Sequence, residues 1–432
     1  MKIPPVKGTR DFYPKEMAVR NWIIDGWKKV SIRNGFEEYD GPIFEYLQMY
    51  QIKSGDEIVE QLFSLKDRGG RDLALRPEIT PTLARMVNQK INSLPRPIKW
   101  FSVPRLCRAE RPQKGRLREF FQWNIDIIGV DDVLADAEVI FTTVDYLREV
   151  GLTPNDVKVK ISSRKLLAAF LKSLGIADDN LLPLYAVLDK KAKIPTEVFQ
   201  QMLAEKVADK TKAGQIQRFM DTTTIEKLES QMNLPEGKIE AYKEIKNLFS
   251  ILRSMGIADF CVFDPSIVRG LAYYTGVVFE VHDIKGDLRA ISGGGRYDNL
   301  LHDFGGPKLS ATGMGMGDCV LEILLKERGL LNVPSRQVDY FVAFAPGFSG
   351  NTACELACEL RRRGYIANFS YNFNAGLSKQ LKAASDCNAK KCIIIGQEYA
   401  DKRELVVKDM ATGQQKLIKR DEFLAQVESE AQ

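Results

Sequence analysis

Apolar residues recur at helical spacing in the first part of the chain, between Pro14 and Gly35. Proline suits the first turn of a helix and glycine often follows its end, so this segment predicts an amphipathic helix. The apolar positions that recur every three or four residues are Val19, Ile23, Trp27 and Val30. Residues 36–45 come next and are predicted to form a strand whose proline, Pro42, is tolerated mainly at a sheet edge or an irregular position.

Short apolar runs bounded by charged residues or glycine predict antiparallel strands in the following part of the chain. These runs are 62–65, 73–75, 98–103 and 120–128. A helix is predicted over 135–150, because acidic residues stand in its first turn and Gly151 follows its end. This mixture favours an α+β domain built on an antiparallel sheet with helices.

The pattern changes between residues 163 and 255, where helical segments joined by polar linkers carry no compact chemical motif. The predicted helices are 166–174, 180–190, 197–207 and 242–255. We interpret this stretch as a helical insertion between two parts of one domain. After it, strands are predicted over 259–263 and 276–283, a glycine-rich loop over 293–295 and a helix over 318–328.

Residues 329–335 form a predicted linker, and strands and helices alternate beyond it. The alternating segments are 338–345, 352–363, 365–369, 377–387, 391–395, 404–408 and 421–428. This order predicts a small α/β domain with a largely parallel sheet over residues 336–432. The rest of the chain is then one domain, made of residues 1–162 and 256–328 and interrupted by the insertion at 163–255.

The composition fits an ordinary globular protein. Hydrophobic residues make up 44% and charged residues 28% of the 432 positions, which excludes a disordered chain, a collagen and a disulfide-rich miniprotein. No run approaches the roughly 18 apolar residues of a membrane helix, and no apolar signal segment follows Met1. The seven cysteines are scattered and predicted to be reduced, so we expect a cytoplasmic protein that does not bind membranes.

Positive charge is concentrated in one short segment. The whole chain has a net charge of only +5, whereas residues 96–118 carry eight basic side chains and one acidic side chain, Glu110. A solvated basic loop is one interpretation of this cluster. The other is a site for an anionic ligand, since such a cluster repels itself unless negative charge lies beside it.

The segment 105–126 predicts a hairpin of two strands joined by a basic loop that contains proline and glycine. Because successive side chains of a strand alternate, Arg108 and Glu110 share one face of the first strand. On the second strand, the side chains that share a face are Phe120, Gln122, Asn124 and Asp126. Charged groups make a poor core but a good floor for a polar ligand, since arginine binds phosphate oxygens and phenylalanine can stack on a base.

This hairpin resembles motif 2 of the class II aminoacyl-tRNA synthetases, in the form found in the histidyl-tRNA synthetase family. Its most specific part is Arg-Pro-Gln-Lys-Gly-Arg at 111–116. Further stretches that resemble signatures of that family are Lys-Gly-Thr-Arg-Asp-Phe-Tyr-Pro at 7–14, Leu-Arg-Pro-Glu-Ile-Thr at 75–80, and the pair 269–280 and 292–298. Together with the carboxy-terminal pattern, the resemblance covers most of the chain and leaves only the insertion weakly matched.

The resemblance implies a two-step reaction. L-Histidine attacks the α-phosphate of ATP to give histidyl-adenylate and pyrophosphate, and the histidyl group then passes to the 3′ end of tRNA(His). Arg108 and Arg269 are implied as catalytic residues, with Arg108 at the α-phosphate and Arg269 bridging that phosphate and the substrate carboxylate. The residues implied in histidine binding are Glu78, Thr80, Arg108, Gln122, Asp126, Arg269, Tyr273 and Tyr274, and those implied in ATP binding are Arg108, Glu110, Arg116 and Phe120. Without the other motifs, Arg269 and the two tyrosines would be interpreted as a loop arginine and sheet aromatics.

Two glycine-rich stretches leave questions open. Residues 292–298 are predicted either to form a tight turn or to let the backbone approach the ligand. Residues 313–317 match the glycines of the third class II motif, but Val320 stands where most of these enzymes carry an arginine at the ATP. Arg296 and Arg116 are the candidates to replace that arginine.

Other ligand classes are weaker predictions. A dinucleotide-binding loop is disfavoured, because its third glycine would fall at Asp318. Cys354 and Cys358 have helical spacing, but such cysteines usually pack as small hydrophobic residues, and no resident metal site is predicted. Mg²⁺ is expected together with ATP, although the sequence contains no recognisable cluster of ligands for it.

The family resemblance also implies partners. The family forms homodimers through its first motif, here residues 35–45. Residues 336–432 resemble its anticodon-binding domain, although 14 basic and 12 acidic side chains give that segment little net charge. Two other functions stay open: a regulatory subunit of ATP phosphoribosyltransferase, which shares the fold but typically lacks the tRNA domain, and an RNA-binding or sensor module without turnover. The complete set of Arg108, Gln122 and Arg269 favours the ligase.

Overall fold

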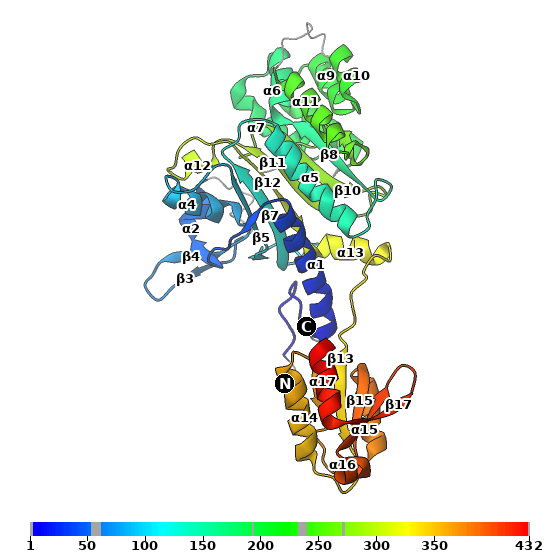
Figure 1. The fold of residues 1–432 in the computed structure, drawn as a ribbon. Helices are drawn as coiled ribbons and strands as arrows, with labels where there is room; N and C mark the ends of the chain where they lie inside the picture. The colour runs from blue at the N-terminus through cyan, green and yellow to red at the C-terminus, as the bar shows by residue number, and fades with distance from the viewer. Residues whose placement is uncertain (1–2, 53–61, 192–193, 232–239, 270–272, 431–432) are drawn as a thin grey trace. The chain divides into compact units, whose positions relative to one another are not determined.

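The computed structural model describes residues 3–52, 62–191, 194–231, 240–269 and 273–430. The chain forms two compact units, residues 1–333 and 334–432, and Figure 1 labels the helices and strands of each. Each unit has its own sheet and its own hydrophobic core. Within the described residues, no helix is long and apolar enough to cross a membrane.

A nine-stranded sheet forms the centre of the first unit. Its main path is β1 (Glu37–Glu38), β5 (Ile98–Ser102), β7 (Glu119–Ile128), β12 (Ala311–Gly317), β11 (Ser292–Tyr297), β10 (Val277–Asp283), β8 (Val157–Ser163) and β9 (Cys261–Phe263), with β6 (Arg105–Cys107) paired to β7. Neighbouring strands are antiparallel except at the two ends, where β1 pairs with β5 and β8 with β9 in parallel. The predicted α+β fold on a mostly antiparallel sheet is confirmed.

Two helices cover one face of this sheet (Figure 1). They are α1 (Pro14–Arg33) and α5 (Leu134–Glu149), and both were predicted from the sequence. Strand β7 buries its odd-numbered side chains, from Phe121 to Ile127, beneath them. Trp123 stacks on Trp27 with ring centroids 6.2 Å apart and donates a hydrogen bond to Ser31 Oγ at 2.8 Å. Burial of each large apolar side chain contributes about 1.5–3 kcal/mol, and strand alternation directs the even-numbered side chains of β7 to the opposite face.

A smaller sheet and two more helices belong to the same unit. They are β2 (Phe44–Tyr46), β4 (Asp72–Leu75), β3 (Ser64–Lys66), α2 (Leu47–Gln51) and α4 (Thr80–Lys90). The strand predicted over 36–45 is correct only in part, because it is divided between β1 and β2, which belong to different sheets. Pro42, which has no N–H to donate, lies in the interruption. Arg76 holds the chain between the two strands, because its Nη1 donates to Asp40 Oδ1 at 2.6 Å and to Gly41 O at 2.8 Å.

A group of helices follows β8. They are α6 (Arg164–Ser173), α7 (Leu181–Leu188), α8 (Thr196–Lys206), α9 (Lys210–Met220), α10 (Ile225–Gln231) and α11 (Glu240–Ser254). The four predicted helices are confirmed, and α9 and α10 are additional. Helix α9 does have a sequence signal, since the side chain of Asp209 caps it by accepting from the N–H of Thr211 at 2.8 Å. The helices share one apolar core with the large sheet, and the boundaries of the insertion at 163–255 stay a prediction.

The glycine-rich loop predicted at 293–295 is wrong, and so is a tight turn at these glycines. They lie inside β11, a central strand of the sheet. Close packing excludes larger residues here, because a Cβ on Gly294 would lie 2.2 Å from the carbonyl oxygen of Gly313 in β12. Between β11 and the predicted helix α13 (Asp318–Glu327) the chain forms the short helix α12 (Leu300–Asp303) and then strand β12.

The second unit is a five-stranded sheet covered by helices. Its strands in spatial order are β14 (Ala367–Phe369), β13 (Val338–Phe344), β15 (Ala389–Ile395), β16 (Glu404–Asp409) and β17 (Gln415–Lys419). Its helices are α14 (Gly350–Arg362), α15 (Leu377–Asp386), α16 (Gln397–Lys402) and α17 (Arg420–Glu430). The predicted parallel sheet is confirmed for β13, β14 and β15, whereas β16 and β17 add antiparallel strands. Strand β17 and helix α16 were not predicted, since both are short and mostly polar.

Candidate functional site

A cavity of about 970 Å³ lies on the face of the large sheet to which the even-numbered side chains of β7 point. Its walls come from β7, β10, β11 and β12, from the loop between β6 and β7, and from the first turn of α13. All the predicted site residues line it: Glu78, Thr80, Arg108, Glu110, Arg116, Phe120, Gln122, Asp126, Arg269, Tyr273 and Tyr274. The structure therefore brings them together, and the ligand that each binds stays a prediction.

Glycines of β11 and β12 make room for charged side chains on the cavity floor. A Cβ on Gly313 would lie 2.0 Å from Asp126 Oδ1, and a Cβ on Gly293 would lie 2.1 Å from Arg269 Nη1. Any larger residue at either position would displace the charged group above it. Close approach of the backbone to the ligand, the second interpretation of the glycines, stays a prediction, and the groups seen to approach the backbone are side chains of the site itself.

Two buried carboxylates line the cavity, and each has one oxygen without a partner in the described part of the chain. Glu78 Oε2 accepts a hydrogen bond from the Tyr273 hydroxyl at 3.2 Å, and Asp126 Oδ1 accepts one from Tyr297 at 2.6 Å. Burial raises the pKa of Glu78, and it raises the pKa of Asp126 to about 7 although the bond from Tyr297 opposes it. A buried oxygen without a partner is costly, so both groups are ready to accept hydrogen bonds from a ligand.

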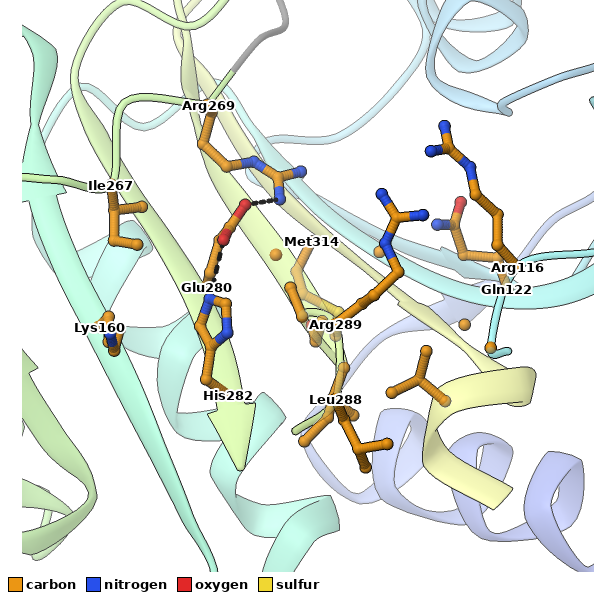
Figure 2. Close-up of a pocket in the computed structure, with 18 of the residues that line it drawn as sticks. Arg116, Gln122, Lys160, Ile267, Arg269, Glu280, His282, Leu288, Arg289 and Met314 are labelled. Carbon is orange, nitrogen blue, oxygen red and sulfur yellow. Dashed lines mark hydrogen bonds and ion pairs between the residues drawn. The ribbon is translucent and has the colours of Figure 1, made fainter. Parts of the chain in front are cut away.

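Arg269 is held by an ion pair on the cavity wall (Figure 2). Its Nη1 lies 2.7 Å from Glu280 Oε1, and Glu280 Oε2 lies 2.9 Å from His282 Nε2. Burial raises the pKa of Glu280, but the hydrogen bond with His282 and the charge of Arg269 outweigh it and hold that pKa at about 2. Burial lowers the pKa of Arg269, whereas Tyr274 and Glu280 raise it above the ordinary value. The guanidinium therefore stays charged and fixed in place.

Arg164 secures the backbone of Arg269, although no sequence motif marks it. Its Nη1 donates to the carbonyl oxygen of Tyr274 at 3.2 Å, its Nε donates to that of Val268 at 3.0 Å, and its Nη2 donates to that of Arg269. Arg269 has a φ of 59°, a left-handed conformation that is uncommon for residues other than glycine. Residues 270–272 of the predicted signature lie outside the described residues. Arg164 thus fixes the backbone on both sides of them.

The hairpin between β6 and β7 adds an aromatic ring and two more arginines. Arg108 Nε donates to the carbonyl oxygen of Pro77 at 3.0 Å, and its guanidinium carbon lies 5.0 Å from the centroid of the Phe120 ring. Burial lowers the pKa of Arg108, and the carboxylate of Glu78 opposes this shift. Glu110 forms an ion pair with Arg116. Cations beside an aromatic ring suit a ligand that carries both phosphates and a base.

Arg296 is not part of the cavity wall, so the suggestion that it supplies the missing cation is wrong. Its guanidinium is buried and pairs with Asp136 at 2.5 Å, and its Nη1 donates to Val130 O at 2.9 Å. Arg289, in the connection between β10 and β11, does line the cavity, and no sequence motif indicated it. Val320 lines the cavity too, as the motif predicted.

The charged groups define the chemistry that the cavity can perform. Carboxylates with unpaired oxygens suit a cationic or polar group, and fixed guanidinium groups suit carboxylates and phosphates. Such cations let two anionic reactants approach one another without proton transfer. Among the described residues, no three His, Cys, Asp or Glu side chains are grouped so that they could hold a metal ion.

Comparison with known proteins gives consistent similarities. Residues 8–317 match the family model described as histidyl-tRNA synthetase, and residues 343–430 match the anticodon binding domain. The chloroplastic/mitochondrial histidine–tRNA ligase of Arabidopsis thaliana is 39% identical over 96% of this chain and 85% of its own, and the histidine–tRNA ligase of Opitutus terrae is 38% identical over 97% of each. The crystal structure of histidyl-tRNA synthetase from Nostoc sp. PCC 7120 has the same fold, with a TM-score of 0.81, 23% identity and full coverage of both chains.

Proposed function

This chain belongs to the histidyl-tRNA synthetase family, and from that premise we propose how its cavity performs the reaction of a histidine–tRNA ligase. The enzyme activates L-histidine with ATP to histidyl-adenylate and pyrophosphate, and then transfers the histidyl group to the 3′ end of tRNA(His). One observation carries the assignment of residues. The same cavity is lined by a guanidinium that an ion pair holds in place, Arg269, and by two other buried carboxylates, Glu78 and Asp126, that each keep an unpaired oxygen.

The buried carboxylates serve histidine recognition in this proposal. Glu78, Thr80 and Gln122 bind the ammonium group, while Asp126 and Tyr274 face the imidazole ring and Tyr273 lines the pocket. The free Oε1 of Glu78 and the free Oδ2 of Asp126 support these roles, because each needs a donor that the described residues do not supply. A pocket built to hydrogen-bond the imidazole rejects amino acids without it by about 10⁴-fold, since its own buried groups would then go unpaired.

Arg108 and Arg269 act on the reacting groups. Arg108 binds the α-phosphate, and Arg269 bridges that phosphate and the substrate carboxylate. A carboxylate oxygen of histidine attacks the α-phosphorus, the bond from that phosphorus to the bridging oxygen breaks, and pyrophosphate leaves with the electron pair. Both reactants are anionic, so fixed positive charge lowers the barrier by relieving repulsion and stabilising the charge that gathers on phosphate oxygens. No side chain is needed as a nucleophile.

The hairpin residues bind the nucleotide. Phe120 stacks on adenine, while Glu110 and Arg116 contact the rest of ATP. Mg²⁺ accompanies ATP and neutralises phosphate charge when bound. It usually keeps several waters and takes only one or two protein carboxylates, so the absence of a ligand cluster among the described residues is compatible with it. Glu110, whose buried Oε1 has no hydrogen-bond partner in the described part of the chain, is the carboxylate that fits this role.

Three further features of the enzyme belong to the proposal. The carboxy-terminal unit reads the anticodon of tRNA(His), as its match to the anticodon binding domain supports. The protein is a homodimer formed through residues 35–45, and several apolar side chains in and near this segment are exposed. The compartment is the cytoplasm, although the relative from Arabidopsis thaliana is described as chloroplastic/mitochondrial.

Two measurements test these roles. Histidine-dependent exchange of pyrophosphate into ATP is expected for the native protein and is expected to be abolished by Arg269→Ala. Total tRNA is also incubated with each labelled amino acid in turn, and only histidine is expected to be attached to it. An Arg269→Ala variant that exchanges pyrophosphate at the native rate would remove the central assignment.

A further inference from the structure

The first turn of α13 brings no cation to the ATP end of the cavity. Val320 lies there, 7% exposed, and a Cβ on Gly115 of the hairpin loop would be 3.0 Å from Val320 Cγ2. Asp318, in the same turn, already pairs with Arg10 at 2.5 Å. The helix has one basic residue, Lys326 in its last turn, which pairs with Glu322 at 2.5 Å. The positive charge that class II enzymes place at this position must therefore come from elsewhere in the fold.

Arg289 enters the cavity from a different element. It lies between the end of β10 and the start of β11 and lines the same cavity as Arg116 and Arg269, and Figure 2 shows the three side chains extending into that cavity. Burial lowers the pKa of Arg108, and the charges of Arg269 and Arg289 lower it further, as expected for guanidinium groups that share one space. Three segments of the chain thus bring positive charge to the same cavity.

Arg289 differs from Arg108, Arg116 and Arg269 because it is exposed and its charge is not compensated by a protein carboxylate. Arg269 pairs with Glu280, Arg116 pairs with Glu110, and the carboxylate of Glu78 raises the pKa of Arg108 against the effect of burial. Within the described residues, no hydrogen bond or ion pair to a protein group is found for Arg289. Water solvates this exposed guanidinium, and an anion that lies between it and the other guanidinium groups is attracted by all of them.

The proposed function assigns the α-phosphate to Arg108 and Arg269, which leaves Arg116 as the only side-chain cation assigned to the rest of ATP, beside the Mg²⁺ that accompanies it. We propose that Arg289 binds the outer phosphates of ATP and the departing pyrophosphate, and so replaces the arginine that is missing at Val320. This inference rests on the proposed function of the cavity. As the α-phosphorus–oxygen bond breaks, the electron pair passes to pyrophosphate, and Arg289 stabilises the charge that develops there.

The expected consequence is a defect confined to ligands with outer phosphates. A charge-assisted hydrogen bond of this kind corresponds to a change of about 10- to 100-fold in affinity. Arg289→Gln should raise the KM for ATP and weaken inhibition by inorganic pyrophosphate by that factor. Binding of histidyl sulfamoyl adenosine, an unreactive analogue of the adenylate that has no outer phosphates, should stay within about twofold of native. Arg289→Lys should recover part of the loss, because it restores the charge without the planar fork.

Lys285→Gln is the matched control, since it removes one positive charge from the same β10–β11 connection at an exposed position that does not line the cavity. It should leave all three measurements at native values, which separates local binding from a general field effect. The inference is overturned if Arg289→Gln leaves the KM for ATP unchanged, or if it weakens binding of the adenylate analogue as much as it weakens binding of ATP. Failure of the proposed function is distinguishable, because Arg269→Ala would then exchange pyrophosphate at the native rate, independently of the results for the Arg289 variants.

Discussion

Glu280 holds the guanidinium of Arg269 at 2.7 Å, while its second carboxylate oxygen lies 2.9 Å from the ring of His282. In the proposed function, the guanidinium held in this way binds the substrate carboxylate and the α-phosphate. The pKa of Glu280, about 2, lies far below the physiological range, so the carboxylate is charged at every pH at which the enzyme works. The ion pair therefore sets the position of Arg269 rather than acting as a switch.

Glu280→Gln should lower kcat for pyrophosphate exchange by about 10- to 100-fold, because the neutral amide holds the guanidinium less firmly. Exchange kinetics measure this effect. Glu119→Gln, which breaks the more exposed pair with Arg105 at 3.1 Å, should leave kcat unchanged. Equal losses in both variants would show that Glu280 has no special part in positioning Arg269.

Arg164→Lys should impair both stability and turnover. Lysine cannot reach the carbonyl groups on both sides of residues 270–272, so at least one buried carbonyl loses its donor, at a cost of about 1–3 kcal/mol. Urea unfolding measures the stability change and pyrophosphate exchange the turnover. A variant with native stability and native kcat would contradict the positioning role of Arg164.

The sequence predicted the parts of this site that show a repeating pattern. The alternation on β7 correctly directed Gln122 and Asp126 to one face, because a strand has a fixed period of two. Residues that act through distant partners had no such pattern. Arg164 is 105 positions from the carbonyl it binds at Arg269, and nothing in its surrounding sequence distinguishes it from a surface arginine on a helix.

The glycines of β11 show a second limit. A run of glycines has no side-chain alternation and normally indicates a turn, so residues 293–295 were predicted as a loop. Their actual requirement is space: Gly293 lies under Arg269 and Gly294 against the backbone of β12. That requirement arises only when strands distant in sequence come together. Composition around the glycines therefore could not distinguish a strand from a turn.

Gly313→Ala should damage histidine binding selectively. The added methyl group would lie 2.0 Å from Asp126 Oδ1 and must displace that carboxylate. We expect the KM for histidine to rise by at least about tenfold, with a smaller change in the KM for ATP. Gly317→Ala is the control on the same strand, because a Cβ there meets no protein atom within 4 Å, although Gly317 also lines the cavity. Similar effects of both substitutions would indicate general damage to β12 and contradict the specific contact.

Asp126 should give histidine binding an acid limb near neutral pH. Burial raises the pKa of this carboxyl to about 7, so the charged form that accepts a hydrogen bond from the imidazole predominates only above that pH. The KM for histidine should therefore rise as pH falls through 7. Tyr297→Phe removes the hydrogen bond that favours the charged form, and should move this limb to higher pH. Because the substrate imidazole titrates in the same range, the difference between native and variant profiles is the decisive measurement, and identical profiles would exclude Asp126 as their origin.

The exposed apolar side chains in and near residues 35–45 provide a test of the proposed homodimer. Phe44 on β2 is 52% exposed and Tyr46 is 56% exposed, with Ile43 and Leu65 exposed nearby. A stable interface usually buries about 800 Å² on each partner around such apolar anchors, and a charge placed among them must be desolvated when the partners meet. Phe44→Asp should therefore convert a dimer into a monomer in sedimentation velocity at micromolar concentration. Leu417→Asp, on the carboxy-terminal unit at 54% exposure, should leave the dimer intact. If the native protein sediments as a monomer, the proposed dimer is wrong. If Phe44→Asp still sediments as a dimer, the interface lies on another surface.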